Sequence, residues 1–536
     1  MTNTLIVTIL VAYFLVLVGI SFLTSKKANN ASFFLGERKS PWYIVSFGMI
    51  GASLSGVTFI SVPGWVGNET NQFSYMQAVF GYLVGYFIVA YVLLPLYYRL
   101  NLTSIYEYLK QRFGLWSYKT GASFFLLSRI IGASVRLLLV ANVLQSILFD
   151  NWGIPFEVTV IISVLLIWIY TSRGGIKTIV WTDTLQTAFM LGSVLLTVWY
   201  ISDAMGLAEK GGVVQTVSNS GYSQIFFFDD ISSSNHFLKH FLGGIFITIG
   251  MTGLDQDMMQ KNLSCRNIKD AQKNMISMAA VLVVVNLIFL SLGALLYLYA
   301  ESNGIDYEKS DLLFSSVALN GDMGAVIGVL FLLGLIAAAY SSADSALTSL
   351  TTSFSIDFLG VKNNTESKKE VGAKEVLKDL IDAPINGEIE YVKVVLDKKN
   401  ERTRKIVHVV MSGVIILVVL LLKYTTDDSA IGLLMKFAGF TYGPLIGMFF
   451  FGIMTKRLLN DKLVPFICLL SIIITFVLWY FSAGAPGIES GAQGIFGAYK
   501  FGFELIILNS LITFTMLLGM SKSSAKIVKH EDSNPR

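Results

Sequence analysis

The sequence predicts an all-α polytopic membrane protein with about thirteen transmembrane helices, and three observations lead to that prediction. Of the 536 residues, 54% are hydrophobic and only 14% are charged, whereas soluble domains carry roughly 25% charged residues. Apolar runs of about 20 residues recur from one end of the chain to the other, and each is long enough to cross a bilayer as one helix. Basic residues gather in alternate loops between these runs, as the positive-inside rule requires.

Charged and polar breaks divide the apolar sequence into thirteen expected spans. These cover residues 4–24, 42–66, 76–98, 118–148, 156–171, 178–202, 236–260, 274–299, 322–359, 406–425, 430–455, 463–482 and 501–520. Two of them, 118–148 and 322–359, are longer than one bilayer crossing, so we expect tilt or an extension beyond the lipid.

The orientation follows from the basic residues between the spans. One set of alternate loops and the tail contains Lys26, Lys27, Arg38, Lys39, Arg99, Lys110, Arg112, Arg173, Lys177, Lys261, Arg266, Lys269, Lys273, Lys456, Arg457, Lys462, Lys522, Lys526 and Lys529. The opposite set holds little beyond Lys210, Lys309 and Lys500. Because cytoplasmic loops carry the excess of Lys and Arg, the N-terminus is expected outside and the C-terminus inside.

The spans suggest an order of parts along the chain. The expected parts are a peripheral first helix at 1–24, a first repeat at 42–202, a second repeat at 236–455 interrupted by a charged cytoplasmic linker at 361–405, additional C-terminal helices at 463–520 and a cytoplasmic tail at 521–536. The linker is rich in Lys, Glu and Asp and has no apolar run able to form a core, so we expect solvated chain there.

Several function classes lack support in the sequence. Cys265 and Cys468 are too few for a disulfide framework, and no metal-ligating or phosphate-binding motif is visible. No nucleophile–base arrangement and no basic nucleic-acid patch is visible either. These observations argue against an enzyme and against a nucleic-acid partner.

Two spans are interrupted at mid-membrane by residues that weaken helices. Residues 48–58 contain three glycines and three hydroxyl side chains, and residues 248–257 repeat the pattern. Glycine lowers helix stability and hydroxyls can bond the freed backbone groups, so both helices are expected to unwind there. Each interrupted helix opens a set of five spans, which is typical of a transporter built from five-plus-five inverted repeats.

Polar and charged side chains inside other spans mark candidate sites. Ser341, Asp344 and Ser345 share one helix face, where hydroxyls could bind a hard monovalent cation. Asp183 lies within the sixth span and needs a cation, a proton or a basic partner. Arg136 either holds a substrate carboxylate or pairs with an intramembrane acid, and for Arg129 the acid pair is the favoured hypothesis.

Five segments in order resemble the sodium:solute symporter family, which includes sodium–glucose, sodium–proline, sodium–iodide and sialic acid transporters. Residues 29–36 and 41–42 resemble its first loop, 103–114 its TxxEYLxxRFG element, 171–186 its GG…WTDxxQ signature and 256–271 the segment that closes its broken sixth core helix. The resemblance covers nearly the whole chain. It implies the inverted-repeat fold first seen in amino-acid transporters, with extra helices before and after the core.

The resemblance also implies a main sodium site between the first and eighth core helices. Its ligands here would be the carbonyls of Gly51, Leu54 and Ala338 and the hydroxyls of Ser341 and Ser342.

Some members of the family hold a second sodium ion at positions that align with Asp183, Ser341, Asp344 and Ser345. Here Asp344 replaces a serine, which strengthens that site by charge, makes it protonatable or indicates a different arrangement. One or two Na+ are therefore expected to move with each solute.

The substrate is expected to lie among polar residues near the interrupted helices. The candidates are Ser53, Ser55, Thr58, Gln77, Tyr82, Arg136, Thr252 and Lys436. The side chains that bind hexoses in sugar carriers are replaced at the aligned positions Val79, Thr58, Thr248 and Lys436, which argues against hexose recognition by that pattern. The cations Arg136 and Lys436 favour a carboxylate-bearing solute, such as a monocarboxylate, an acidic sugar or an amino acid.

The expected function is sodium-coupled symport of a small organic solute into the cell by alternating access. A proton-coupled carrier on the same fold, which would titrate Asp183 or Asp344, and an ion channel stay open as alternatives. Short loops and the lack of a disulfide framework favour the inner membrane of a bacterium, and a monomer would suffice.

Overall fold

Nine helices among the described residues are long and apolar enough to cross a membrane, and two bent helix pairs raise the number of candidate spans to eleven. The computed structural model describes residues 3–25, 30–67, 71–307, 309–320, 324–361, 386–425, 430–483 and 493–522. The prediction of an all-α multi-pass membrane protein is confirmed. Most of the predicted linker at 361–405 and nearly all of the tail at 521–536 lie outside the described residues.

The long helices correspond to the predicted spans. They are α1 (Asn3–Thr24), α5 (Tyr75–Ile88) continued by η2 (Val89–Leu93) and α6 (Leu94–Arg99), α8 (Leu115–Leu144), α10 (Ile176–Ala204), α14 (Ile268–Asn303), α16 (Gly324–Ser353), α18 (Asn386–Thr425), α19 (Ala430–Met454) and α20 (Val464–Tyr480). Two shorter apolar helices, α9 (Phe156–Gly174) and α21 (Leu505–Met520), lie at the positions of the remaining unbroken spans. The connections carry the short helices α2 (Asn30–Leu35), α7 (Glu107–Arg112), α11 (Gly212–Ser218) and α15 (Leu313–Asn320).

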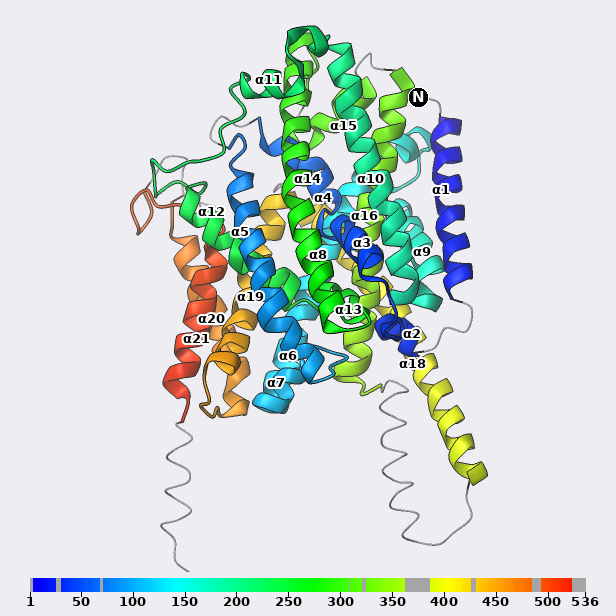
Figure 1. Ribbon diagram of the computed structural model, residues 1–536, viewed down its shortest axis with the longest axis vertical. Coiled ribbons are helices and arrows are strands. Elements are labelled where there is room, and N and C mark those ends of the chain that lie inside the picture. The colour runs from blue at the N-terminus through cyan, green and yellow to red at the C-terminus, as the bar shows by residue number, and fades with distance from the viewer. Residues whose placement is uncertain are drawn as a thin grey trace, which may run out of the picture.

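The helices run mostly along the long axis of the molecule (Figure 1). At one edge α1 packs against α9 and α10, and at the opposite edge α20 and α21 pack against α19. The interior helices include α3 (Trp42–Ser53), α8, α16 and α13 (Gln256–Leu263), and every residue of α13 is buried. A fully buried helix that carries charges is costly unless those charges are paired within the protein.

The first interrupted span is a bent pair, as the sequence predicts. Helix α3 ends at Ser53, α4 (Gly56–Trp65) begins at Gly56, and their axes meet at 55°. The backbone leaves the helix at Leu54 (φ −91°, ψ 63°) and Ser55 (φ −57°, ψ 175°). The glycine at position 56 follows the bend, where its lack of a side chain allows close approach to α16.

The second interrupted span bends by 64° between α12 (Phe237–Thr248), which η6 (Ile249–Gly253) extends, and α13. Asp255 lies at the bend and caps α13, because its side chain accepts hydrogen bonds from the backbone N–H groups of Asp257 at 2.9 Å and Met258 at 3.4 Å. An aspartate at this position also interacts favourably with the positive end of the helix dipole.

Helices α5 and α12 approach each other closely through glycines. A Cβ atom on Gly81 would overlap the carbonyl oxygen of Phe241, and one on Gly244 would overlap that of Ala78. Small residues at helix contacts let two backbones pack directly against each other in a membrane. This contact fixes α12, the first half of the second broken helix, against α5.

We predict that Gly244→Ala lowers the thermal stability of the purified protein, because the new methyl group meets backbone atoms that cannot give way; overpacking of this kind costs about 1–3 kcal/mol. The matched control is Gly192→Ala in α10, where an added Cβ meets nothing within 4 Å. That control should be neutral or slightly stabilising. Equal melting temperatures for the two variants would contradict the glycine contact.

Candidate functional site

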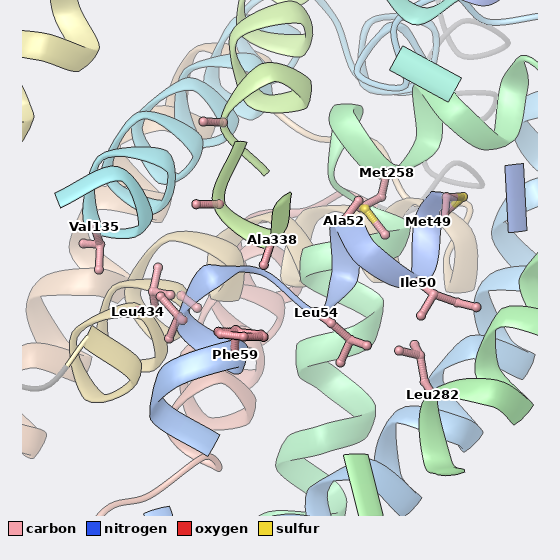
Figure 2. Close-up of a cluster of buried hydrophobic side chains, with 14 of the residues drawn as sticks. Met49, Ile50, Ala52, Leu54, Phe59, Val135, Met258, Leu282, Ala338 and Leu434 are labelled. Carbon is pink, nitrogen blue, oxygen red and sulfur yellow. The ribbon is translucent and has the colours of Figure 1, made fainter. Parts of the chain in front are cut away.

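The bend between α3 and α4 faces α16. A Cβ on Gly56 would lie 3.2 Å from the Cβ of Ala339. Figure 2 shows Leu54 of the bend and Ala338 of α16 in one cluster of buried hydrophobic side chains. The last carbonyl groups of α3 lose their helical partners where the helix ends. On its other side α3 is held by α10, because the Gly51 N–H donates to the Thr187 hydroxyl at 3.1 Å.

Helix α16 presents buried hydroxyls to this region. Ser341, Ser342 and Ser345 are fully buried, and Ser342 Oγ donates to the carbonyl oxygen of Ala338 at 3.3 Å. The structure thus brings together the two elements that carry the predicted main sodium set, with Gly51 and Leu54 on one side and the α16 residues on the other. Backbone carbonyls and hydroxyls together suit a hard monovalent cation.

Asp183 of α10 lies in a cluster of polar groups, which we name the Asp183 cluster: Asp183, Ser341, Asp344, Ser345 and Lys261. Ser341 Oγ donates to Asp183 Oδ1 at 2.7 Å, and Ser345 Oγ lies 3.5 Å from Oδ2. The ammonium group of Lys261 is 2.8 Å from the same Oδ2. Asp344 interacts with Asp183, Lys261 and Ser345 as well. All four residues of the predicted second sodium set therefore belong to one cluster, together with a lysine that the sequence did not place there.

The position of Lys261 corrects the sequence interpretation. The sequence predicts Lys261 to be a cytoplasmic loop charge. In the structure its side chain is only 1% exposed and lies inside the protein on α13. Its spacing of four residues from Asp257 was the available signal, since residues at i and i+4 share a helix face. The distance from Lys261 Nζ to Asp257 Oδ1 is 4.0 Å.

Arg129 of α8 also forms an ion pair with α13. It forms an ion pair with Asp257, and its Nη1 lies 3.7 Å from Asp255 Oδ2. The hydroxyl of Tyr442 donates to that Asp255 oxygen. The favoured hypothesis that Arg129 pairs with an intramembrane acid is confirmed. Asp257 thus connects Arg129 with Lys261, and through Lys261 with Asp183.

A cavity opens beside the bend of the first broken helix. Six of the eight predicted substrate residues line it, namely Ser53, Ser55, Thr58, Tyr82, Arg136 and Thr252. Arg136 is 7% exposed, and among the described residues no hydrogen-bond partner meets its Nε and Nη1 atoms. A guanidinium group with free donors in a cavity is suited to binding a carboxylate in bidentate fashion.

The other two predicted substrate residues lie elsewhere. Gln77 is fully buried and donates a hydrogen bond to the carbonyl of Asn235 at 2.9 Å, so it stabilises the loop before α12. The ammonium of Lys436 lies 5.1 Å from the centre of the Trp479 ring. Neither lines the cavity, so the prediction that they contact the substrate has no support from their positions.

Sequence reasoning missed several residues that line the cavity. Arg129, Asn286 and Tyr86 are among them, and the Tyr86 hydroxyl lies 3.2 Å from Ser53 Oγ. For Asn286 a signal existed, since it is an amide within the apolar run of α14, and polar groups inside spans are commonly functional. Tyrosine gave no such signal because it is also a common apolar packing residue.

Comparisons with known proteins agree with these observations. Residues 33–380 match the profile of the family described as Sodium:solute symporter family. The sodium/sialic acid symporter SiaT of Proteus mirabilis is 24% identical over 454 residues, which cover 83% of each chain. The human sodium-coupled monocarboxylate transporter 2 is 29% identical over 259 residues, covering 46% of this chain and 39% of that one.

Solved structures show the fold. A Na+-coupled sialic acid symporter in a substrate-bound outward-open state superposes with a TM-score of 0.76 at 20% identity, covering 96% of this chain and 98% of that one. MHP1, a transporter of the nucleobase-cation-symport-1 family in a closed conformation, superposes with a TM-score of 0.51 at 11% identity, covering 91% and 93%.

We predict that Arg129→Met strongly destabilises the protein, because the buried carboxylates of Asp257 and Asp255 then lose the guanidinium that lies between them. Breaking a buried ion pair on one side costs about 3–5 kcal/mol. Thermal melting in detergent measures this loss, and the double variant Arg129→Met/Asp257→Asn should recover part of it. The control Arg99→Met changes an exposed arginine and should have little effect. A double variant no more stable than the single one would contradict the pairing.

Proposed function

This chain belongs to the sodium:solute symporter family and is a sodium-coupled solute symporter, a secondary active transporter. We propose that its cargo is a small solute that bears a carboxylate, and that Arg136 binds this carboxylate in the cavity. The observation that carries the proposal is the buried guanidinium of Arg136, whose Nε and Nη1 atoms have no hydrogen-bond partner among the described residues, in a cavity that is also lined by hydroxyls. An amide or a hydroxyl would have sufficed for a neutral solute, whereas a buried cation is stabilised by an anion.

The relatives support an acidic cargo. By their names, SiaT of Proteus mirabilis and NanT of Aliivibrio fischeri carry sialic acid, and the human relative carries monocarboxylates. Sialic acid and a monocarboxylate differ in size but share the carboxylate. That shared group is the one we assign to Arg136, with the hydroxyls of Ser53, Ser55, Thr58 and Thr252 and of Tyr82 around it.

Sodium occupies the main site in this proposal. The carbonyls of Gly51, Leu54 and Ala338 and the hydroxyls of Ser341 and Ser342 bind it between the first broken helix and α16. These ligands come from two elements whose contact depends on the bend at Leu54, so sodium favours the bend geometry that also shapes the cavity. Each ligand then raises the affinity for the other by the same factor.

Alternating access follows from the arrangement of the helices. Each bent pair is followed by four apolar helices, α5, α8, α9 and α10 after the first and α14, α16, α18 and α19 after the second. We take these as the two inverted repeats at 42–202 and 236–455. In the transport cycle a four-helix bundle rocks against the helices around it, with the ion and the solute bound between them. Helices α1, α20 and α21 are peripheral.

If the shorter apolar helices α9 and α21 also cross the membrane, the eleven candidate spans among the described residues become thirteen. With thirteen crossings, the start of α1 is outside the cell and the end of α21 is in the cytoplasm in this proposal. The loop after α13 stays basic without Lys261, because Arg266, Lys269 and Lys273 remain in it. The inner membrane of a bacterium is the membrane we propose.

We predict that Ser342→Ala removes the stabilisation by sodium. At a sodium concentration about 100-fold above its dissociation constant, binding to the folded state adds roughly 2.7 kcal/mol to the free energy of unfolding. Loss of a hydroxyl that binds an ion costs about 1.5–3 kcal/mol, so most of that gain should disappear. The measurement is the melting temperature in sodium chloride against choline chloride.

The matched control is Ser349→Ala on the same helix, whose hydroxyl bonds the backbone carbonyl of Ala346 at 2.9 Å. It should keep the sodium response. A sodium response that survives in Ser342→Ala would contradict the main site.

We predict that Arg136→Met abolishes stabilisation by acidic solutes in a panel of sialic acid, short monocarboxylates, hexoses and neutral amino acids. The wild type should be stabilised by one or more carboxylates in sodium and by no hexose. Arg136→Lys keeps the charge but loses the bidentate geometry, so its affinity should fall roughly tenfold or more. If Arg136→Met responds to the same acids as the wild type, the assigned role of Arg136 is wrong.

A further inference from the structure

The Asp183 cluster contains two carboxylates and one ammonium group. Asp183 comes from α10 and Asp344 from α16, and both are fully buried or nearly so. Asp344 Oδ2 accepts a hydrogen bond from the Tyr170 hydroxyl at 2.9 Å. The ammonium is that of Lys261, which lies on a third element, α13.

The contacts around Asp183 are already those of a bound cation. Lys261 Nζ lies 2.8 Å from Oδ2, and both side chains are 1% exposed. The Ser341 hydroxyl donates a hydrogen bond to Oδ1 at 2.7 Å, and the Ser345 hydroxyl lies 3.5 Å from Oδ2. A sodium ion at this place would need these oxygens as ligands, but the carboxylate that would dominate its binding is paired with the lysine.

Asp257 and Arg129 hold Lys261 in this position. Asp257 lies one turn earlier on α13, at 4.0 Å from the ammonium, and Arg129 pairs with Asp257. The ion-pair chain leaves the lysine little freedom to withdraw from Asp183. Lysine is also a compact point charge, which makes it a closer substitute for a monovalent metal ion than the planar guanidinium of arginine.

We propose that the ε-ammonium of Lys261 is a tethered cation that takes the place of a second sodium ion, so that this symporter binds and moves one sodium ion per cycle. The inference rests on the proposed main sodium site and deepens it. With one sodium ion bound at that site, through Ser341 and its neighbours, the two carboxylates of the cluster are balanced by two cations. One of these cations is exchangeable and the other belongs to the chain.

The test is equilibrium binding of 22Na+ to the purified full-length protein without any solute. The wild type should bind one sodium ion per chain with a Hill coefficient of one. Lys261→Met should bind two, because Asp183 then lacks its cation and the cluster accepts sodium. Lys261→Arg should stay at one.

Two controls complete the design. Lys177→Met makes the same chemical change at a partly exposed lysine that pairs with Glu37 at 3.3 Å, and it should stay at one sodium ion per chain. The double variant Lys261→Met/Asp183→Asn removes both charges of the pair, so it should fold even where the single variant does not. It should bind one sodium ion.

Three results would overturn the inference: two sodium ions bound to the wild type, one bound to a folded Lys261→Met, or two bound to the double variant. Failure of the proposed function looks different. In that case the wild type binds no sodium saturably, or its binding is unchanged in Ser342→Ala, whatever happens at Lys261.

Discussion

The structure depends on the compensation of charge inside a low-dielectric interior. A chain of contacts runs from Arg129 at the cavity through Asp257 and Lys261 to Asp183, and from there to Ser341 on α16. It connects α8, α13, α10 and α16. Since an unpaired buried charge is costly, separating α13 from α8 or from α10 would leave a buried charge without its partner. The same contacts that allow polar groups in the interior therefore hold α13 against α8 and α10.

The broken helices give this chain its geometry. Helix α13 begins at Gln256 because Asp255 lies at the bend and caps the first turn. A continuous helix through this region would point Asp257 and Lys261 in other directions. The bend in α3 and α4 has the complementary effect, because it brings backbone carbonyls close to α16 without adding charge. One break thus positions side-chain charges, and the other supplies the neutral oxygens of the proposed main sodium site.

Features with a local cause could be predicted from the sequence. The spans follow from hydropathy, both bends from clustered glycines and hydroxyls, and the buried face of Ser341 and Ser345 from helical periodicity. Features that depend on contacts between distant segments could not. Lys261 looked like a loop charge because it follows an interrupted span and precedes several exposed basic residues; only its contact with Asp183, 78 positions away in the sequence, reveals its role. Gln77 and Lys436 are polar residues near the interrupted spans in the sequence, but their side chains contact the Asn235 carbonyl and the Trp479 ring, and such contacts depend on distant segments.

The lysine inside the cluster has a consequence for energetics. A carrier that moves one sodium ion together with one monovalent carboxylate transfers no net charge, so its transport is electroneutral. The membrane voltage, worth about 2.3 kcal/mol per elementary charge at 100 mV, then does no work on the cycle. Such a symporter accumulates its solute only up to the sodium concentration ratio. It would keep that capacity in a cell whose membrane is depolarised, provided that the sodium gradient persists.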